Sequence, residues 1–137
     1  MPYDIQLARI YAPPAETDGA RVLVDRLWPR GKRKDALQLT EWLPSVSPSP
    51  SLRKEWHAGT LDDKTFGARY RNELKAEAEE LIPLMRYARK GRLTLLTASK
   101  EPQHSHLPVL RRAILKALEK EDREADGHEP SSPTCYE

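Results

Sequence analysis

Three short apolar runs in the chain have the length of β-strands. Residues 4–11 largely alternate apolar and polar positions, whereas residues 21–26 and 93–98 have continuously apolar centres. Alternation is typical of a strand with one buried face, and an unbroken apolar run is typical of a strand buried on both faces. The pattern therefore predicts an α/β fold, a three-layer domain with a short, mainly parallel sheet that is flanked by helices.

Two helices are predicted between the second and third of these runs. Ser49 and Pro50 are suited to the N-cap and first position of a helix that ends near His57. Residues 60–63 then resemble a capping box with Asp in place of Glu. The apolar residues that follow at four-residue spacing predict the buried stripe of a second helix: Phe66, Tyr70 and Leu74.

Two further helices complete the expected set. Proline is tolerated in the first turn of a helix, so Pro83 predicts a helix that starts near Glu80 and ends at the cationic pair before Gly91. A last amphipathic helix is expected from about Ser105 to about Lys120. Residues 121–137 carry little apolar surface, so we expect the α/β domain to span residues 1–120 and a flexible polar tail to follow.

The segment of residues 31–51 shows little periodicity. It has several prolines and reads as a long, irregular excursion, with Trp42 as the residue that anchors it to the rest of the domain. Loops of this length inside compact domains are more often functional or disordered than short loops are.

The composition excludes several classes of protein. A chain of 137 residues with 38% hydrophobic and 32% charged residues is typical of one globular domain, and its net charge of +2 is too small to imply a nucleic-acid partner by itself. The single Cys135 rules out an internal disulfide. No apolar run is long enough to span a membrane and no signal segment opens the chain, so a cytoplasmic location is expected.

Charged and aromatic residues follow the second strand directly. Asp25 could orient an arginine, bind a metal or act as a base, and Arg26 and Arg30 could clamp a phosphate or carboxylate. A structural role is an equal alternative, with Asp25 as the cap of a turn and Arg26 paired with a surface acid. Trp28 could pack under the loop or act as a stacking platform for a ring. Open α/β sheets place their sites at the carboxyl ends of strands, so this segment predicts a binding site.

A second polar cluster follows the third predicted strand. Lys100 is a candidate anion contact, and His104 and His106 precede the last helix. Neutral imidazoles there would suit acid–base work or substrate orientation, although histidines that only cap or pack remain an equal alternative. The two histidines lack a third ligand, so no metal site is predicted.

Several motifs together resemble one known family. The sequence Val-Leu-Val-Asp-Arg-Leu-Trp-Pro-Arg-Gly at 22–31, Glu-Trp-Leu at 41–43 and Pro-Ser-Leu-Arg at 50–53 are similar to the YeaO-like family, catalogued as domain of unknown function 488. The resemblance covers residues 4 to about 120 and implies a small cytoplasmic α/β domain, mostly from bacteria or archaea, without an established reaction. It places the pocket on these residues: Asp25, Arg26, Trp28, Arg30, Lys100 and His106.

Two functional hypotheses follow, and the sequence names no cofactor for either. In the first, the chain is an enzyme that acts on a small phosphate- or carboxylate-bearing ligand, with His106 as acid–base and Asp25 as its orienter. In the second, it is a non-catalytic module that binds nucleic acid through Trp28 and the cations of residues 30–34, or a protein-interaction module. Whether the chain is an enzyme stays open at this point.

Overall fold

The computed structural model describes residues 3–127, except for the side chains of residues 34, 35, 126 and 127. This part of the chain contains a four-stranded parallel sheet. The strands lie in the order β1-β4-β2-β3, and every pair is parallel. Their bounds are β1 (Ile5–Arg9), β2 (Ala20–Leu23), β3 (Glu41–Trp42) and β4 (Leu93–Thr97). The predicted α/β fold with a short parallel sheet is confirmed.

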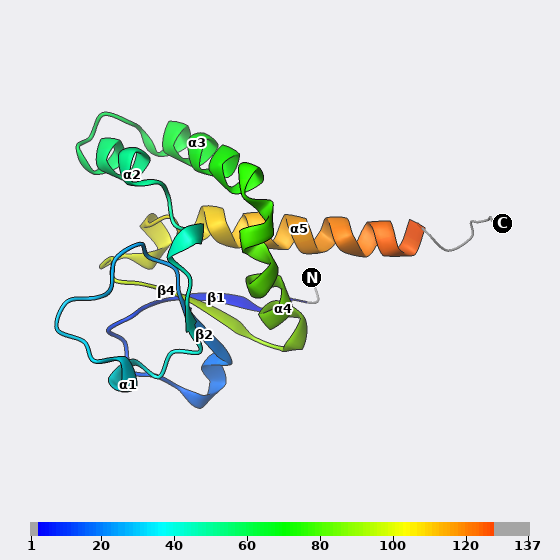
Figure 1. Ribbon diagram of the computed structural model, residues 1–137, viewed down its shortest axis with the longest axis horizontal. Helices are drawn as coiled ribbons and strands as arrows, with labels where there is room; N and C mark the ends of the chain where they lie inside the picture. The colour runs from blue at the N-terminus through cyan, green and yellow to red at the C-terminus, as the bar shows by residue number, and fades with distance from the viewer. Residues whose placement is uncertain (1–2, 128–137) are drawn as a thin grey trace.

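One face of the sheet is covered by long helices. These are α3 (Asp63–Ala76), α4 (Ile82–Lys90) and α5 (Leu107–Gly127) (Figure 1). Their apolar stripes form one buried cluster with side chains such as Val22 and Leu95 of the strands. The predicted stripe of Phe66, Tyr70 and Leu74 is buried there. This cluster is the main hydrophobic core.

The opposite face has a much thinner cover. The short helix α1 (Lys34–Leu37) and its flanking loop lie on the other side of the sheet from α3 and α5 (Figure 1). They enclose a small second cluster of Leu23 and Leu96 with Ile10 and Leu37. The third layer is therefore mostly loop, which explains why the sequence shows no amphipathic helix for it.

The helix starts largely follow the predicted caps. α2 spans Pro50–His57, and the Ser49 side chain accepts a hydrogen bond from the backbone N–H of Leu52. The capping box at residues 60–63 is wrong: the N-cap of α3 is Asp62, whose carboxylate accepts from Thr65 N at 2.8 Å. Thr60 instead donates its hydroxyl to the Glu55 carbonyl at the end of α2.

Two boundaries differ from those that the sequence suggested. A short 3-10 helix at Ala78–Leu81 precedes α4, with Pro83 in the first turn as expected. The last helix was expected to end near Lys120, but α5 continues to Gly127. Its extra turns are held by Arg89, which pairs with Glu121 at 2.8 Å and Asp122 at 3.0 Å. The rest of the predicted tail, residues 128–137, lies outside the described residues.

The irregular excursion contains a strand that the sequence did not reveal. Glu41 and Trp42 pair in parallel with Val22 and Leu23, and so extend the sheet by one edge strand. Two residues are too few to show a period of two, which is why the pattern gave no signal. Trp42 is 38% exposed, so it does not anchor this segment by burial in the core. Its indole N–H instead donates a hydrogen bond to the Asp25 carbonyl at 2.8 Å.

Three other 3-10 turns connect these elements: Glu16–Asp18, Pro44–Val46 and Pro102–His104. None of the helices within residues 3–127 is both long enough and apolar enough to cross a membrane.

Candidate functional site

A cavity of about 550 Å³ opens at the carboxyl edge of the sheet. The segments that follow β2 and β4, the helix α2 and the residues just before α5 form its walls. In a parallel sheet this edge gathers the loops that leave neighbouring strands, and β2 and β4 are neighbours here. The two polar clusters that the sequence placed after strands therefore meet at one cavity, although not with every member.

Asp25 joins the ends of the two central strands. Its Oδ2 accepts a hydrogen bond of 2.7 Å from the backbone N–H of Ala98, just beyond β4. Its Oδ1 is buried and has no hydrogen-bond partner among the described residues. One carboxylate oxygen therefore fixes the sheet edge, and the other remains available as an acceptor beside the cavity.

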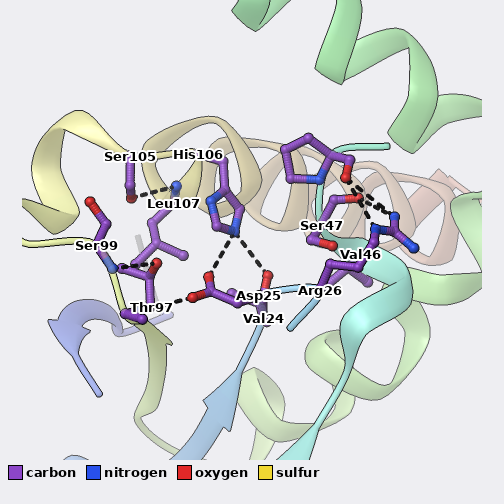
Figure 2. Close-up of polar contacts among 12 residues, drawn as sticks. Val24, Asp25, Arg26, Val46, Ser47, Thr97, Ser99, Ser105, His106 and Leu107 are labelled. Atoms are coloured by element: carbon purple, nitrogen blue, oxygen red, sulfur yellow. Dashed lines mark hydrogen bonds and ion pairs between the residues drawn. The ribbon is translucent and has the colours of Figure 1, made fainter. Parts of the chain in front are cut away.

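His106 lies against Asp25 but bonds to the backbone. Figure 2 shows its ring above the end of β2, where Nε2 contacts the Val24 carbonyl oxygen at 2.8 Å and Asp25 Oδ1 at 3.6 Å. A carbonyl oxygen only accepts, so Nε2 carries the proton and donates. Burial lowers the pKa of His106; the Asp25 carboxylate and the Val24 hydrogen bond oppose this effect without reversing it. The imidazole is neutral at pH 7, and Nδ1 is its free acceptor.

Arg26 is held by the loop that leads to α2. Its Nε and Nη2 donate to the backbone carbonyl of Pro48, and Nη2 also donates to that of Ser47 at 3.0 Å (Figure 2). Arg26 lines the cavity. However, much of the planar fork that would clamp an anion is already engaged, so its main contribution is to fasten the cavity wall.

Trp28 and Arg30 have different environments in the same loop. The Trp28 indole donates to the Lys32 carbonyl at 2.9 Å, and its ring packs edge-on against Trp42 with centroids 5.3 Å apart. Trp28 thus has the packing role and also lines the cavity. Arg30 is exposed, lines the cavity and has no side-chain partner among residues 3–127.

Lys100 and His104 lie farther from the centre. His104 is at the rim, with a side chain 77% exposed and 3.7 Å from a carboxylate oxygen of Glu101. Lys100 is exposed and is absent from the lining of the cavity. Its position shortly after β4 brings it to the correct edge of the sheet, but its side chain is not part of the cavity wall.

The wall formed by α2 was not predicted. Arg53, Trp56 and His57 line the cavity from this helix. Trp56 is held rigidly, because it stacks on Phe66 with centroids 3.6 Å apart and donates to Asp63 at 3.1 Å. Residues at i, i+3 and i+4 share one helix face, so this spacing was the available signal. The caps of α2 give its bounds but do not show which of its faces turns toward the cavity.

Tyr11 lies at the rim of the cavity, near the cations of residues 30–34. Its ring lies 5.2 Å from the Arg9 guanidinium carbon and 5.3 Å from the Lys32 ammonium nitrogen. Lys32 is thereby turned toward Tyr11, and Lys34 lies in the four-residue helix α1.

The cavity provides charge and aromatic surface but no metal cage. Within residues 3–127, no cluster of three His, Cys, Asp or Glu side chains is arranged to hold a metal ion. Arg30 and Arg53 are cationic, whereas Asp25 and neutral His106 offer acceptors deeper in the wall. The arrangement can bind a ligand that has an anionic end and a hydrogen-bond donor.

This architecture defines a small parallel α/β protein with a cavity at the carboxyl edge of its sheet. The chain belongs to the YeaO-like DUF488 family: residues 4–137 match the family model described as "Inactive DUF488-N3 subclade".

Curated relatives agree with this assignment. "Uncharacterized protein YeaO" of Escherichia coli (strain K12) is 43% identical over 107 residues, which are 78% of this chain and 93% of that protein. "Uncharacterized protein Rv3073c" of Mycobacterium tuberculosis (strain ATCC 25618 / H37Rv) is 37% identical over 106 residues, which are 77% of this chain and 89% of the relative. No solved structure matches the chain.

Proposed function

We propose that this protein binds a small phosphate- or carboxylate-bearing ligand in the cavity and does not turn it over. The observation that carries the proposal is a pair of arginines, Arg30 and Arg53, that line one cavity without a side-chain partner among the described residues. A guanidinium presents a planar fork of donors that matches phosphate and carboxylate oxygens. In this cavity the two forks supply the anion contacts.

The interior of the cavity favours a particular orientation of the ligand. Asp25 would repel an anion, so the anionic group lies toward the two arginines and away from the sheet edge. Nδ1 of His106 then accepts a hydrogen bond from the neutral part of the ligand. Trp56 and Trp28 provide flat apolar walls for an attached ring.

Binding without turnover is supported by how the proposed acid–base pair is used. His106 Nε2 donates to a backbone carbonyl and Asp25 Oδ2 accepts from a backbone N–H, so both groups fasten strand ends. The description of the matching family model as an inactive subclade agrees with this interpretation. The enzyme alternative is favoured by one observation, the 3.6 Å between His106 Nε2 and Asp25 Oδ1.

Calorimetric titration with inorganic phosphate and phenyl phosphate tests the proposal. We expect phenyl phosphate to bind more tightly because of its ring, and Arg30→Gln and Arg53→Gln each to weaken its binding roughly tenfold, the scale of a lost charged hydrogen bond. Arg86→Gln on α4 is the matched control, because it removes an exposed cation that does not line this cavity. Equal affinities for all of these proteins would refute the proposal.

Turnover is measured in the same samples. We expect no release of phosphate from phenyl phosphate above the rate without protein. Release that depends on His106, and disappears in His106→Gln while phenyl phosphate still binds, would restore the enzyme hypothesis.

A further inference from the structure

A second cavity, of about 840 Å³, lies on a different part of the surface. It is bounded by β1, by α3 and by the first half of α5, and it shares no lining residue with the first cavity. Four cationic side chains line it: Arg71, Arg111, Arg112 and Lys116. We call this region the α5 groove.

The positive charge of the α5 groove is not neutralised within the fold. None of its four cations has an ion pair or side-chain hydrogen bond among the described residues. Two carboxylates also line the groove, but Asp4 is paired with Arg92 at 2.8 Å and Glu119 with Arg123 at 2.8 Å. The lining of the groove therefore carries an excess of positive charge.

The order of charges along α5 does not stabilise the helix. Three of the groove's cations, Arg111, Arg112 and Lys116, lie in the N-terminal half of α5. Carboxylates such as Glu119, Glu121 and Asp122 follow toward its C-terminus. The helix macrodipole favours the reverse order, although its effect is concentrated in the terminal turns. Helix stability thus gives no reason for three cations at this end of α5.

The groove also has an apolar lining and an open strand edge. Val109 and Leu115 are half-buried beside Ile5 of β1. β1 is an edge strand among the described residues, because within residues 3–127 it pairs with β4 alone. An edge strand offers backbone N–H and C=O groups to an added strand, and peptides bind many domains in this way.

We propose that the α5 groove binds an acidic, extended peptide segment of a partner protein, which pairs with β1 as an additional strand. Its carboxylates contact Arg71 and the cations of α5, and its apolar side chains pack against Val109 and Leu115. A long polyphosphate chain fits less well, because the carboxylates that follow Lys116 on α5 repel its continuation and the apolar lining finds no partner on a phosphate backbone.

Fluorescence anisotropy with a labelled peptide of about ten residues, composed of Glu and Val, tests this inference at the length of a typical strand. We expect saturable binding to the full chain and a loss of roughly tenfold in affinity for the double variant Arg111→Gln/Lys116→Gln. The matched control, Arg86→Gln/Lys90→Gln on α4, removes the same charge from exposed positions outside the groove and should bind as the unmodified chain does. Melting curves confirm that each variant is folded.

Two further probes separate the alternatives. A peptide N-methylated at alternate backbone positions keeps its charge but loses strand pairing, so its affinity should fall. A single-stranded oligonucleotide with the same number of charges should compete poorly. The inference is overturned if the groove variant binds the peptide normally, if N-methylation has no effect, or if the oligonucleotide binds more tightly than the peptide.

Discussion

The Nε2 atom of His106 donates to the carbonyl oxygen of Val24 over 2.8 Å, and so ties the start of α5 to the end of β2. This bond requires only that Nε2 carry a proton, which holds for the neutral imidazole. Burial penalises the charged form of the ring and lowers its pKa. The histidine is therefore a structural link in its neutral form. Binding of a second proton would charge the ring, and burial makes that charge unfavourable.

Stability should depend on pH through this ring. In the unfolded chain His106 has a pKa near 6.5, and in the folded chain the pKa is lower. Below about pH 6.5 the unfolded state therefore binds a proton that the folded state does not, and the free energy of unfolding decreases as the pH falls, with a limiting slope of about 1.4 kcal/mol per pH unit. Denaturant titrations between pH 7.5 and pH 5, a range chosen around that ordinary pKa, measure this slope.

The matched variants for this measurement are His106→Gln and His104→Gln. A glutamine amide can still donate to the Val24 carbonyl but does not titrate, so His106→Gln should flatten the pH dependence. His104→Gln should leave it unchanged, because that side chain is 77% exposed. A slope that survives in His106→Gln would show that another group is responsible.

Asp25→Asn should lower the pKa of His106 further. The carboxylate raises that pKa through its charge, and an asparagine in its place can keep the acceptor for Ala98 N without the charge. An NMR titration of the His106 ring protons reports the change. The same variant should bind phenyl phosphate more tightly, because a negative charge leaves the cavity wall. A pKa that stays the same or rises would contradict the electrostatic coupling.

Gly19→Ala should destabilise the protein more than Gly31→Ala does. Both glycines have a positive φ, 66° and 71°, which costs about 1 kcal/mol or more for alanine. At Gly19, however, a Cβ would also lie 2.1 Å from the Arg92 carbonyl oxygen, whereas nothing lies within 4 Å at Gly31. Thermal unfolding of the two variants isolates the cost of that clash. Equal melting points would mean that the start of β2 can shift away from Arg92.

The sequence predicted the fold where the local signals were strong. Ser49 and Pro50 fixed the start of α2, and continuous apolar runs located β2 and β4. It missed Glu41 and Trp42, because two residues show no period and their pairing with β2 is set by tertiary contacts. The end of α5 was placed too early because Arg89, a residue far away in the sequence, pairs with the charged residues that extend the helix.

The site followed the same rule. Asp25 and His106 were found because they come directly after a buried strand and directly before a helix. The cavity wall from Arg53 was missed: the spacing of Arg53, Trp56 and His57 puts them on one face of α2, but the spacing alone does not state that this face turns toward the cavity. Lys100 shows the converse, because a residue just beyond a strand end can lie at the correct edge of the sheet without lining the cavity there.

Truncation tests the extended end of α5. Removal of residues 128–137 should leave the thermal midpoint nearly unchanged, because that sequence carries little apolar surface. Removal of residues 122–137 should lower it by a few degrees, because Asp122 accepts hydrogen bonds from Tyr3 at 2.6 Å and Arg89 at 3.0 Å. Exposed ion pairs contribute little each, so the fall should be small. Identical midpoints for both truncations would show that these contacts do not stabilise the fold.

Arg26→Lys separates a structural role from ligand binding. Lysine keeps the positive charge but lacks the fork that reaches the carbonyls of Ser47 and Pro48 together. We expect it to lower the free energy of unfolding by about 1 to 3 kcal/mol, the range for lost hydrogen bonds to a charged group. Phenyl phosphate affinity should change much less than in Arg53→Gln, when both are measured well below the melting point. A stable Arg26→Lys protein with weakened binding would instead place Arg26 among the residues that contact the anion.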